Sequence, residues 1–130
     1  MNRLKLSSLV LLGFLCSGAS AQQSSAEVLF QTDLPDIEGR EAVMLEVVYP
    51  PGVASASHRH NAHTMVYVLE GTVEMQVAGG ELMTLTVGET FYETPSDIHS
   101  VSRNASDTET ARILVVFIKQ IGAAASEPAP

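Results

Sequence analysis

Short apolar runs separated by turn residues follow one another along most of this chain. Within residues 72–77 polar and apolar side chains alternate strictly, as in a strand with one buried face. No long stretch shows the roughly 3.6-residue period of an amphipathic helix. The runs that predict strands cover residues 42–49, 63–69, 72–77, 82–87 and 111–118. Because strands that recur about every 8–12 residues are typical of a sandwich or barrel, we predict an all-β fold.

The start of the chain carries the marks of a cleaved secretory signal. A basic N-terminus is followed by an apolar run over residues 6–16 and by the cleavage pattern Ala19-Ser20-Ala21. The apolar run is about half of the ~20 residues that a membrane-spanning helix needs. We therefore predict a signal peptide over residues 1–21 and a mature chain, 22–130, that is periplasmic or secreted and has no membrane anchor. Cleavage also removes Cys16, the single cysteine, so no thiol is left for chemistry.

Composition and charge limit the functions of the mature chain. The full sequence of 130 residues has 15 acidic and 7 basic side chains and a formal net charge of −8. This balance argues against nucleic-acid binding, because few cations are available to replace counterions along a phosphate backbone. Hydrophobic residues make up 45% of the chain and charged residues 17%, which is typical of one globular domain.

The mature chain divides into a barrel and a tail. We expect the barrel to cover about residues 30–119. Its core is expected to include Val66, Val68, Met75 and Phe91. The tail 121–130 is rich in Ala, Ser and Pro and cannot bury enough apolar surface to order itself, so we predict that it is disordered.

All four histidines fall in two segments of the chain. His58, His60 and His63 lie close together, and His99 follows much later. Side chains at positions i and i+2 of a strand point to the same face, so His58 and His60 should project together. A third imidazole from His99 would complete a site for a first-row transition metal. The alternative is a set of surface or hydrogen-bonded histidines, which an isolated H-x-H pattern more often signifies.

The histidine segments also have spacings that resemble those of the cupin family. The first cupin motif is G-x5-H-x-H-x3-E-x6-G, and its spacing is followed by Gly52, His58, His60 and Gly71. The second motif is G-x5-P-x-G-x2-H-x3-N, and its spacing is followed by Gly88 and His99. The resemblance covers roughly residues 43–119. It implies a single-domain double-stranded β-helix, or jelly roll, that holds a metal through histidines.

The resemblance is incomplete at one expected metal ligand. Thr64 stands where the family has glutamate, and a neutral hydroxyl is a poor ligand for a divalent ion. His63 would compensate if the loop before its strand turned the imidazole inward. Glu93 would compensate if its carboxylate faced the barrel interior, either as a ligand or as a general acid or base beside the metal. The alternatives are a solvent-facing His63 and an exposed Glu93 at a strand end.

The resemblance implies a metal-binding protein with one candidate catalytic residue, Glu93. The candidate metal ligands are His58, His60, His63 and His99. The cofactor is expected to be a divalent transition metal, Fe, Mn, Ni, Cu or Zn. A small-molecule substrate or ligand would use the open coordination positions, as in a non-haem metal-dependent dioxygenase or a related enzyme. The alternatives are a non-enzymatic metal-binding or small-molecule-binding sensor and a barrel that only dimerises. Small cupins often dimerise, so we expect a homodimer.

Overall fold

The computed structural model describes residues 21–130 of the chain. The predicted signal peptide, apart from its last residue, lies outside this range. Within it, no helix is long and apolar enough to cross a bilayer.

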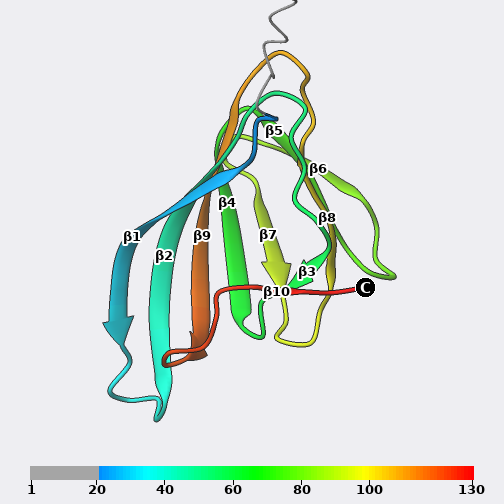
Figure 1. Ribbon diagram of the computed structural model, residues 1–130. Coiled ribbons are helices and arrows are strands. Elements are labelled where there is room, and N and C mark those ends of the chain that lie inside the picture. Colours follow the sequence, from blue (N-terminus) through cyan, green and yellow to red (C-terminus); the bar gives the residue numbers. More distant parts are fainter. Residues whose placement is uncertain (1–20) are drawn as a thin grey trace, which may run out of the picture.

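In residues 21–130, ten strands form two antiparallel sheets that face each other (Figure 1). The first sheet has the order β1-β2-β9-β4-β7 and the second the order β10-β3-β8-β5-β6. The strands of the first sheet are β1 (Ser25–Asp33), β2 (Arg40–Tyr49), β9 (Ala111–Gln120), β4 (His63–Glu70) and β7 (Thr90–Glu93). Those of the second sheet are β10 (Glu127–Pro128), β3 (His58–Arg59), β8 (His99–Asn104), β5 (Thr72–Val77) and β6 (Met83–Thr86). This is the predicted all-β jelly roll.

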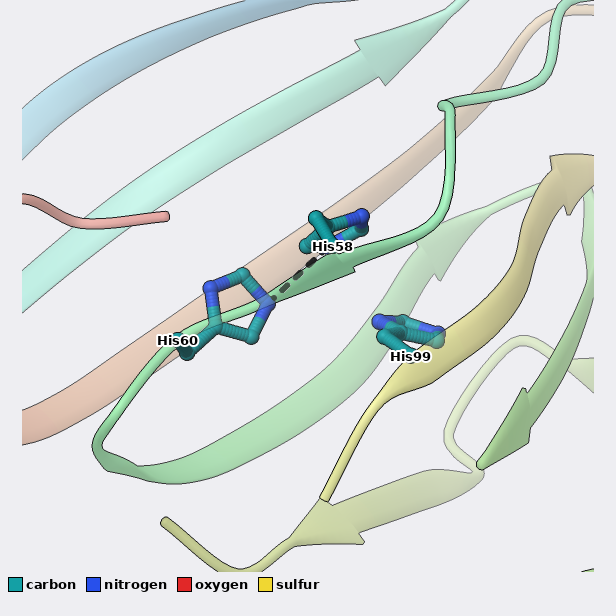
Figure 2. A group of neighbouring side chains, drawn as sticks. All are labelled: His58, His60 and His99. Atoms are coloured by element: carbon teal, nitrogen blue, oxygen red, sulfur yellow. Dashed lines mark hydrogen bonds between the residues drawn. The ribbon is translucent and has the colours of Figure 1, made fainter. Parts of the chain in front are cut away.

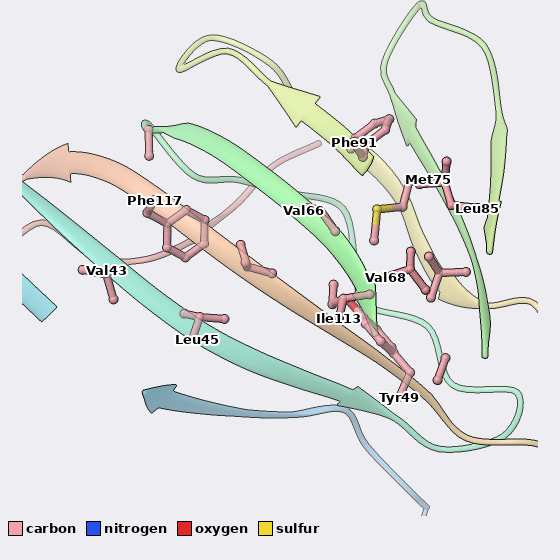
Figure 3. Packing of buried hydrophobic residues seen from close by; sticks show 14 residues of the cluster. Val43, Leu45, Tyr49, Val66, Val68, Met75, Leu85, Phe91, Ile113 and Phe117 are labelled. Carbon is pink, nitrogen blue, oxygen red and sulfur yellow. The ribbon is translucent and has the colours of Figure 1, made fainter. Parts of the chain in front are cut away.

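The core lies between the two sheets and comes from alternate positions of the strands. Along β9 buried and half-buried residues alternate from Ala111 to Lys119, as expected for a strand with one face in the interior. The expected core residues Val66, Val68, Met75 and Phe91 are all buried, at 8% exposure or less. Figure 3 shows them packed with side chains of β2 and β9.

A glycine turn connects the sheets where the first motif ends. Gly71 lies between β4 and β5 with a φ of 71°, a left-handed conformation that favours glycine. A Cβ at this position would lie 2.6 Å from the carbonyl oxygen of Thr110. The motif glycine is therefore required both for the turn and for the close approach of the neighbouring loop.

The tail 121–130 differs from its prediction. It leaves the end of β9, crosses the end of the barrel and pairs with β3 through β10, where Glu127 lies opposite Arg59 (Figure 1). The amide of Ala129 donates to the carbonyl of Ser57 at 3.2 Å, and Ser57 Oγ donates to the carbonyl of Pro130 at 3.1 Å. Specific hydrogen bonds to the barrel thus order a segment that has little apolar surface to bury.

Candidate metal centre

Three histidines meet on the inner side of the second sheet. His58 on β3 and His99 on β8 are direct cross-strand partners, so their side chains project from the same face. His60 follows two residues after His58. One nitrogen from each ring can be chosen so that all of these atoms lie within 4.8 Å of one another. Figure 2 shows the three rings gathered around a shared space.

Backbone carbonyls fix the tautomers of His58 and His60. Nδ1–H of His58 donates to the carbonyl of Ala56 at 2.7 Å, and Nδ1–H of His60 donates to the carbonyl of Ala125 at 2.8 Å. A carbonyl can only accept, so each neutral ring has its proton on Nδ1 and a bare lone pair on Nε2. The two Nε2 atoms lie 3.1 Å apart and are joined by the dashed line in Figure 2. Two lone pairs at this distance repel each other unless a cation binds both.

The geometry favours a metal ion over a proton as that cation. Burial lowers the pKa of His60 below its ordinary value, which disfavours the imidazolium. Two nitrogens bound to one metal ion at about 2.0–2.1 Å lie roughly 3.0–3.4 Å apart. The 3.1 Å between His58 Nε2 and His60 Nε2 falls in this range. The donor set therefore fits a transition metal.

Glu93 adds a carboxylate to the three imidazoles. Its Oε2 lies 3.2 Å from His99 Nδ1 and 3.8 Å from His60 Nε2. Glu93 and His99 are only 2% and 3% exposed. Among the described residues, neither Glu93 Oε2 nor either ring nitrogen of His99 has a hydrogen-bond partner. Because unpaired polar atoms in an apolar interior are costly, a cation bound between these groups would satisfy them together.

Glu93 comes from the strand next to the position where the family has its glutamate. Thr64 on β4 lies directly opposite Glu93 on β7, and both side chains are buried. The hydroxyl of Thr64 is 3.4 Å from the carbonyl of Ala62, a long contact that leaves it weakly engaged. An inward carboxylate is therefore present on the strand next to Thr64. This is the condition under which Glu93 was expected to compensate for the missing glutamate.

His63 does not join the group. Its side chain is exposed, and Nδ1 is hydrogen-bonded to the hydroxyl of Tyr92 at 2.7 Å. Successive side chains of β4 alternate between faces, so His63 points away from the interior that buries Thr64. This corrects the expectation that the imidazole turns inward, since that would require a one-residue slip of the whole strand.

The three histidines and Glu93 line a cavity of about 400 Å³. Much of its wall is apolar, from Leu45, Val47, Val66, Ile113, Val115 and Phe117. No lysine or arginine of the described part of the chain lines it. A cavity of this size and lining fits a small, largely apolar molecule that reaches the histidines.

Two parts of the cavity wall were not predicted from the sequence. Tyr49 Oη is hydrogen-bonded to Ser102 Oγ at 2.8 Å and to Ser55 Oγ at 3.2 Å, which forms a cluster of hydroxyls. The tail contributes residues 125–128. Isolated hydroxyls and a backbone carbonyl are too common along a chain to reveal such roles before the fold is known.

Comparison with known proteins supports the fold assignment. Residues 45–117 match the cupin domain family, and no curated protein matches the chain. One similar solved structure is an uncharacterized conserved protein with a double-stranded β-helix domain from Klebsiella pneumoniae, with 21% identity and a TM-score of 0.66 over 86% of this chain and 89% of that one. Another is a cupin-like protein from Thermotoga maritima, with 20% identity and a TM-score of 0.65 over 82% and 75%.

An enzyme is also among the similar structures. The DMSP lyase DddQ from Ruegeria pomeroyi has 19% identity and a TM-score of 0.61 over 68% of this chain. The present chain spans only 43% of the length of that lyase. Identities this low establish the fold and leave the reaction open. The family match, which extends over more than half of the sequence, shows that the chain belongs to the cupin family.

Proposed function

We propose that this protein is an exported, metal-dependent enzyme that acts on a small organic substrate. The observation that carries the proposal is the pair of Nε2 atoms of His58 and His60, 3.1 Å apart, with both Nδ1 protons held by carbonyls. His99 and Glu93, buried and without hydrogen-bond partners among the described residues, complete the set. His58, His60 and His99 would hold the ion, with Glu93 as fourth ligand.

The metal would be Fe, Mn, Ni, Cu or Zn, since imidazole and carboxylate suit all of these ions. When bound, it would supply Lewis acidity and, if redox-active, electron transfer. The protein side chains would orient the substrate. Apolar residues such as Val66 and Phe117 would exclude water, and the cluster of hydroxyls around Tyr49 would offer a hydrogen bond to a polar group of the substrate.

The specific version that we propose is a non-haem dioxygenase. Its support is an imidazole-rich ligand set that borders a substrate-sized apolar cavity. The test measures oxygen consumption by metal-loaded protein with small enols, thiols and phenolic acids. Uptake that depends on both metal and substrate supports the proposal. Turnover without oxygen uptake would show a different reaction, such as the lyase chemistry named for one of the fold neighbours.

Metal content is the first test of the proposal. Protein purified from its own compartment is expected to carry close to one equivalent of a transition metal. A content under about 0.2 equivalents, with no recovery after reconstitution, would contradict a metal function.

A non-enzymatic carrier or sensor is the second candidate. The crossing tail favours it, because residues 125–128 line the cavity and would slow release of a bound molecule. Stoichiometric binding of a small molecule with no turnover of any member of the substrate panel would select this candidate.

We also propose that the protein is a homodimer that pairs through β1. Val28, Leu29 and Phe30 are 58%, 50% and 55% exposed, and a bulge between Val28 and Phe30 leaves Leu29 without a pairing partner in β2. Among the described strands, β2 is the only neighbour of β1 in its sheet. A second copy would cover this apolar edge. Sedimentation equilibrium should give a dimer for the natural chain and a monomer for Phe30→Lys, whereas Glu81→Lys, in the loop between β5 and β6 of the other sheet, should remain a dimer.

Export is tested by determining the N-terminal residue and the cellular location of the natural protein. Protein isolated from the organism should begin at Gln22 and be found outside the cytoplasm. Intact Met1 in a cytoplasmic fraction would contradict this proposal.

A further inference from the structure

The tail is held at both of its ends by contacts with the barrel. At its start, the buried pair of Glu41 and Lys119 binds the turn that follows β9. The amide of Gly122 donates to Glu41 Oε1 at 3.1 Å, and Lys119 Nζ donates to the carbonyl of Ala123 at 2.6 Å. Glu41 and Lys119 are 2% and 5% exposed, so these bonds form in a water-poor environment, where they are strong.

The other end of the tail is held by β3 and the turn after it. β10 pairs with β3, with Pro128 opposite His58. Asn61 Nδ2 donates to Glu127 Oε2 at 2.9 Å, and Asn61 itself has a left-handed φ of 50°. The segment between Gly122 and Glu127 is therefore fixed across the end of the barrel, as Figure 1 shows for the red end of the ribbon.

The middle of this segment contacts a candidate metal ligand. The carbonyl oxygen of Ala125 accepts the Nδ1–H bond of His60 at 2.8 Å. This bond directs the Nε2 lone pair of His60 toward Nε2 of His58. Partners of this kind hold a ligating imidazole in one tautomer and orientation and raise its basicity.

We infer that the tail is a part of the metal site, in which the backbone carbonyl of Ala125 is the positioning group for His60. The expected effect of the tail on metal affinity rests on the proposed metal function. The hydrogen bond between His60 and Ala125 forms without a metal, so the positioning role and the metal function can be tested separately. His58 serves as an internal reference, because its partner is Ala56 and lies outside the tail.

The first experiment shortens the chain. A variant that ends after Ala123 keeps the contact with Lys119 and loses the Ala125 carbonyl. In metal-free protein, nitrogen chemical shifts of the histidine rings should show His60 as the Nδ1–H tautomer in the full chain and as a mixture in the variant, with His58 unchanged. Affinity for Zn²⁺ should fall by roughly 10–100-fold. A control chain that ends after Pro128 loses the two hydrogen bonds between Ser57 and the last two residues but keeps the Asn61–Glu127 bond and the Ala125 carbonyl, so it should match the full chain at His60.

The second experiment keeps the chain length. Gly122 has a φ of 75° and open space around its Cβ direction, so Gly122→Val strains the turn without a direct clash. Gly88→Val is the matched control, with a φ of 90° and only an ordinary contact of 3.8 Å to Tyr67 Oη. The amide of Gly88 donates to the carbonyl of Val68 on β4, far along that strand from His63. Strain at Gly88 should therefore leave the tail unchanged. Only Gly122→Val should change the His60 tautomer and the Zn²⁺ affinity.

The outcomes separate the two proposals. If the full chain binds no Zn²⁺ and the His60 tautomer still depends on the tail, the positioning role stands and the metal function fails. If the full chain binds Zn²⁺ and both tail variants keep the affinity within twofold and the tautomer unchanged, the positioning role is overturned.

Discussion

Thr64 and Glu93 lie directly opposite each other on β4 and β7, and both side chains point into the barrel. The hydroxyl occupies the position where the cupin pattern has a glutamate, and the carboxylate comes from the neighbouring strand. Cβ atoms of direct cross-strand partners are about 4.5–5.5 Å apart, so the exchange shifts the carboxylate by little more than the length of its own side chain. The site can keep a mixed imidazole and carboxylate character although the glutamate of the first motif is absent.

The first prediction concerns Glu93. Glu93→Gln should weaken Zn²⁺ binding by at least about tenfold, because a neutral amide replaces an anionic ligand. The double variant Thr64→Glu, Glu93→Thr should recover most of the affinity, since the two positions face the same space. Competition with a chelator of known affinity measures both effects. Full metal retention with lost turnover in Glu93→Gln would assign Glu93 as a general base instead.

The second prediction separates the inward histidines from the outward one. His99→Ala should abolish stoichiometric metal binding, because it removes a ligand from a buried site. His63→Ala is the matched control and should leave metal content unchanged, since His63 is exposed and bonded to Tyr92. Metal analysis after gel filtration measures both variants. Equal losses in the two proteins would contradict the assignment of the site.

The third prediction concerns the thermal effect of metal removal. An ion that binds only the folded state at a free concentration of 100 times its Kd adds about 2.7 kcal/mol of stability. For a domain of this size that corresponds to a Tm shift of roughly 10–20 °C. Calorimetry with and without a chelator should show this difference for the natural chain and none for His99→Ala.

The fourth prediction concerns acid stability. Hydrogen bonds from Lys119 and Gln31 hold the pKa of Glu41 below its ordinary value of 4.5. A carboxyl whose pKa is lower in the folded state contributes stability above its unfolded pKa and loses it as the pH falls through the folded pKa. The natural chain should therefore lose free energy of unfolding more steeply below pH ~4.5 than Glu41→Gln does.

Urea titrations between pH 7 and pH 3 measure this difference. Glu81→Gln, in the exposed loop between β5 and β6, is the control and should follow the natural chain. Parallel curves for the natural chain and Glu41→Gln would show that the pair with Lys119 carries no pH-dependent stability.

The long strands were predictable from the sequence because each is a short apolar run bounded by turn residues. The runs 42–49, 63–69, 72–77 and 111–118 correspond to β2, β4, β5 and β9. Among these runs, polar and apolar side chains alternate strictly only in 72–77. β1 was missed since its side chains are exposed along its whole length. β3 and β10 are two residues long and exist through pairing with distant segments, which no local pattern can reveal.

The site was predictable as far as it depends on spacing. Two features were sufficient to predict that the three rings lie close together: the i, i+2 relation of His58 and His60 and the motif position of His99. Whether His63 or Glu93 compensates for the missing glutamate depended on strand register. The register places Glu93 on the inner face of the first sheet and His63 on its outer face. The partner of His60 was beyond prediction, because it is a backbone atom in a segment whose Ala-, Ser- and Pro-rich composition predicted disorder.

Because Ala125 acts through its carbonyl oxygen, any residue with a normal peptide group can take its place. Selection would then act on the number of residues between Gly122 and Glu127 and hardly on their identity. Among relatives, this stretch should vary freely in composition while insertions and deletions are rare. An extension fused beyond Pro130 should be harmless, whereas a single residue added before Ala125 should disturb the imidazole of His60.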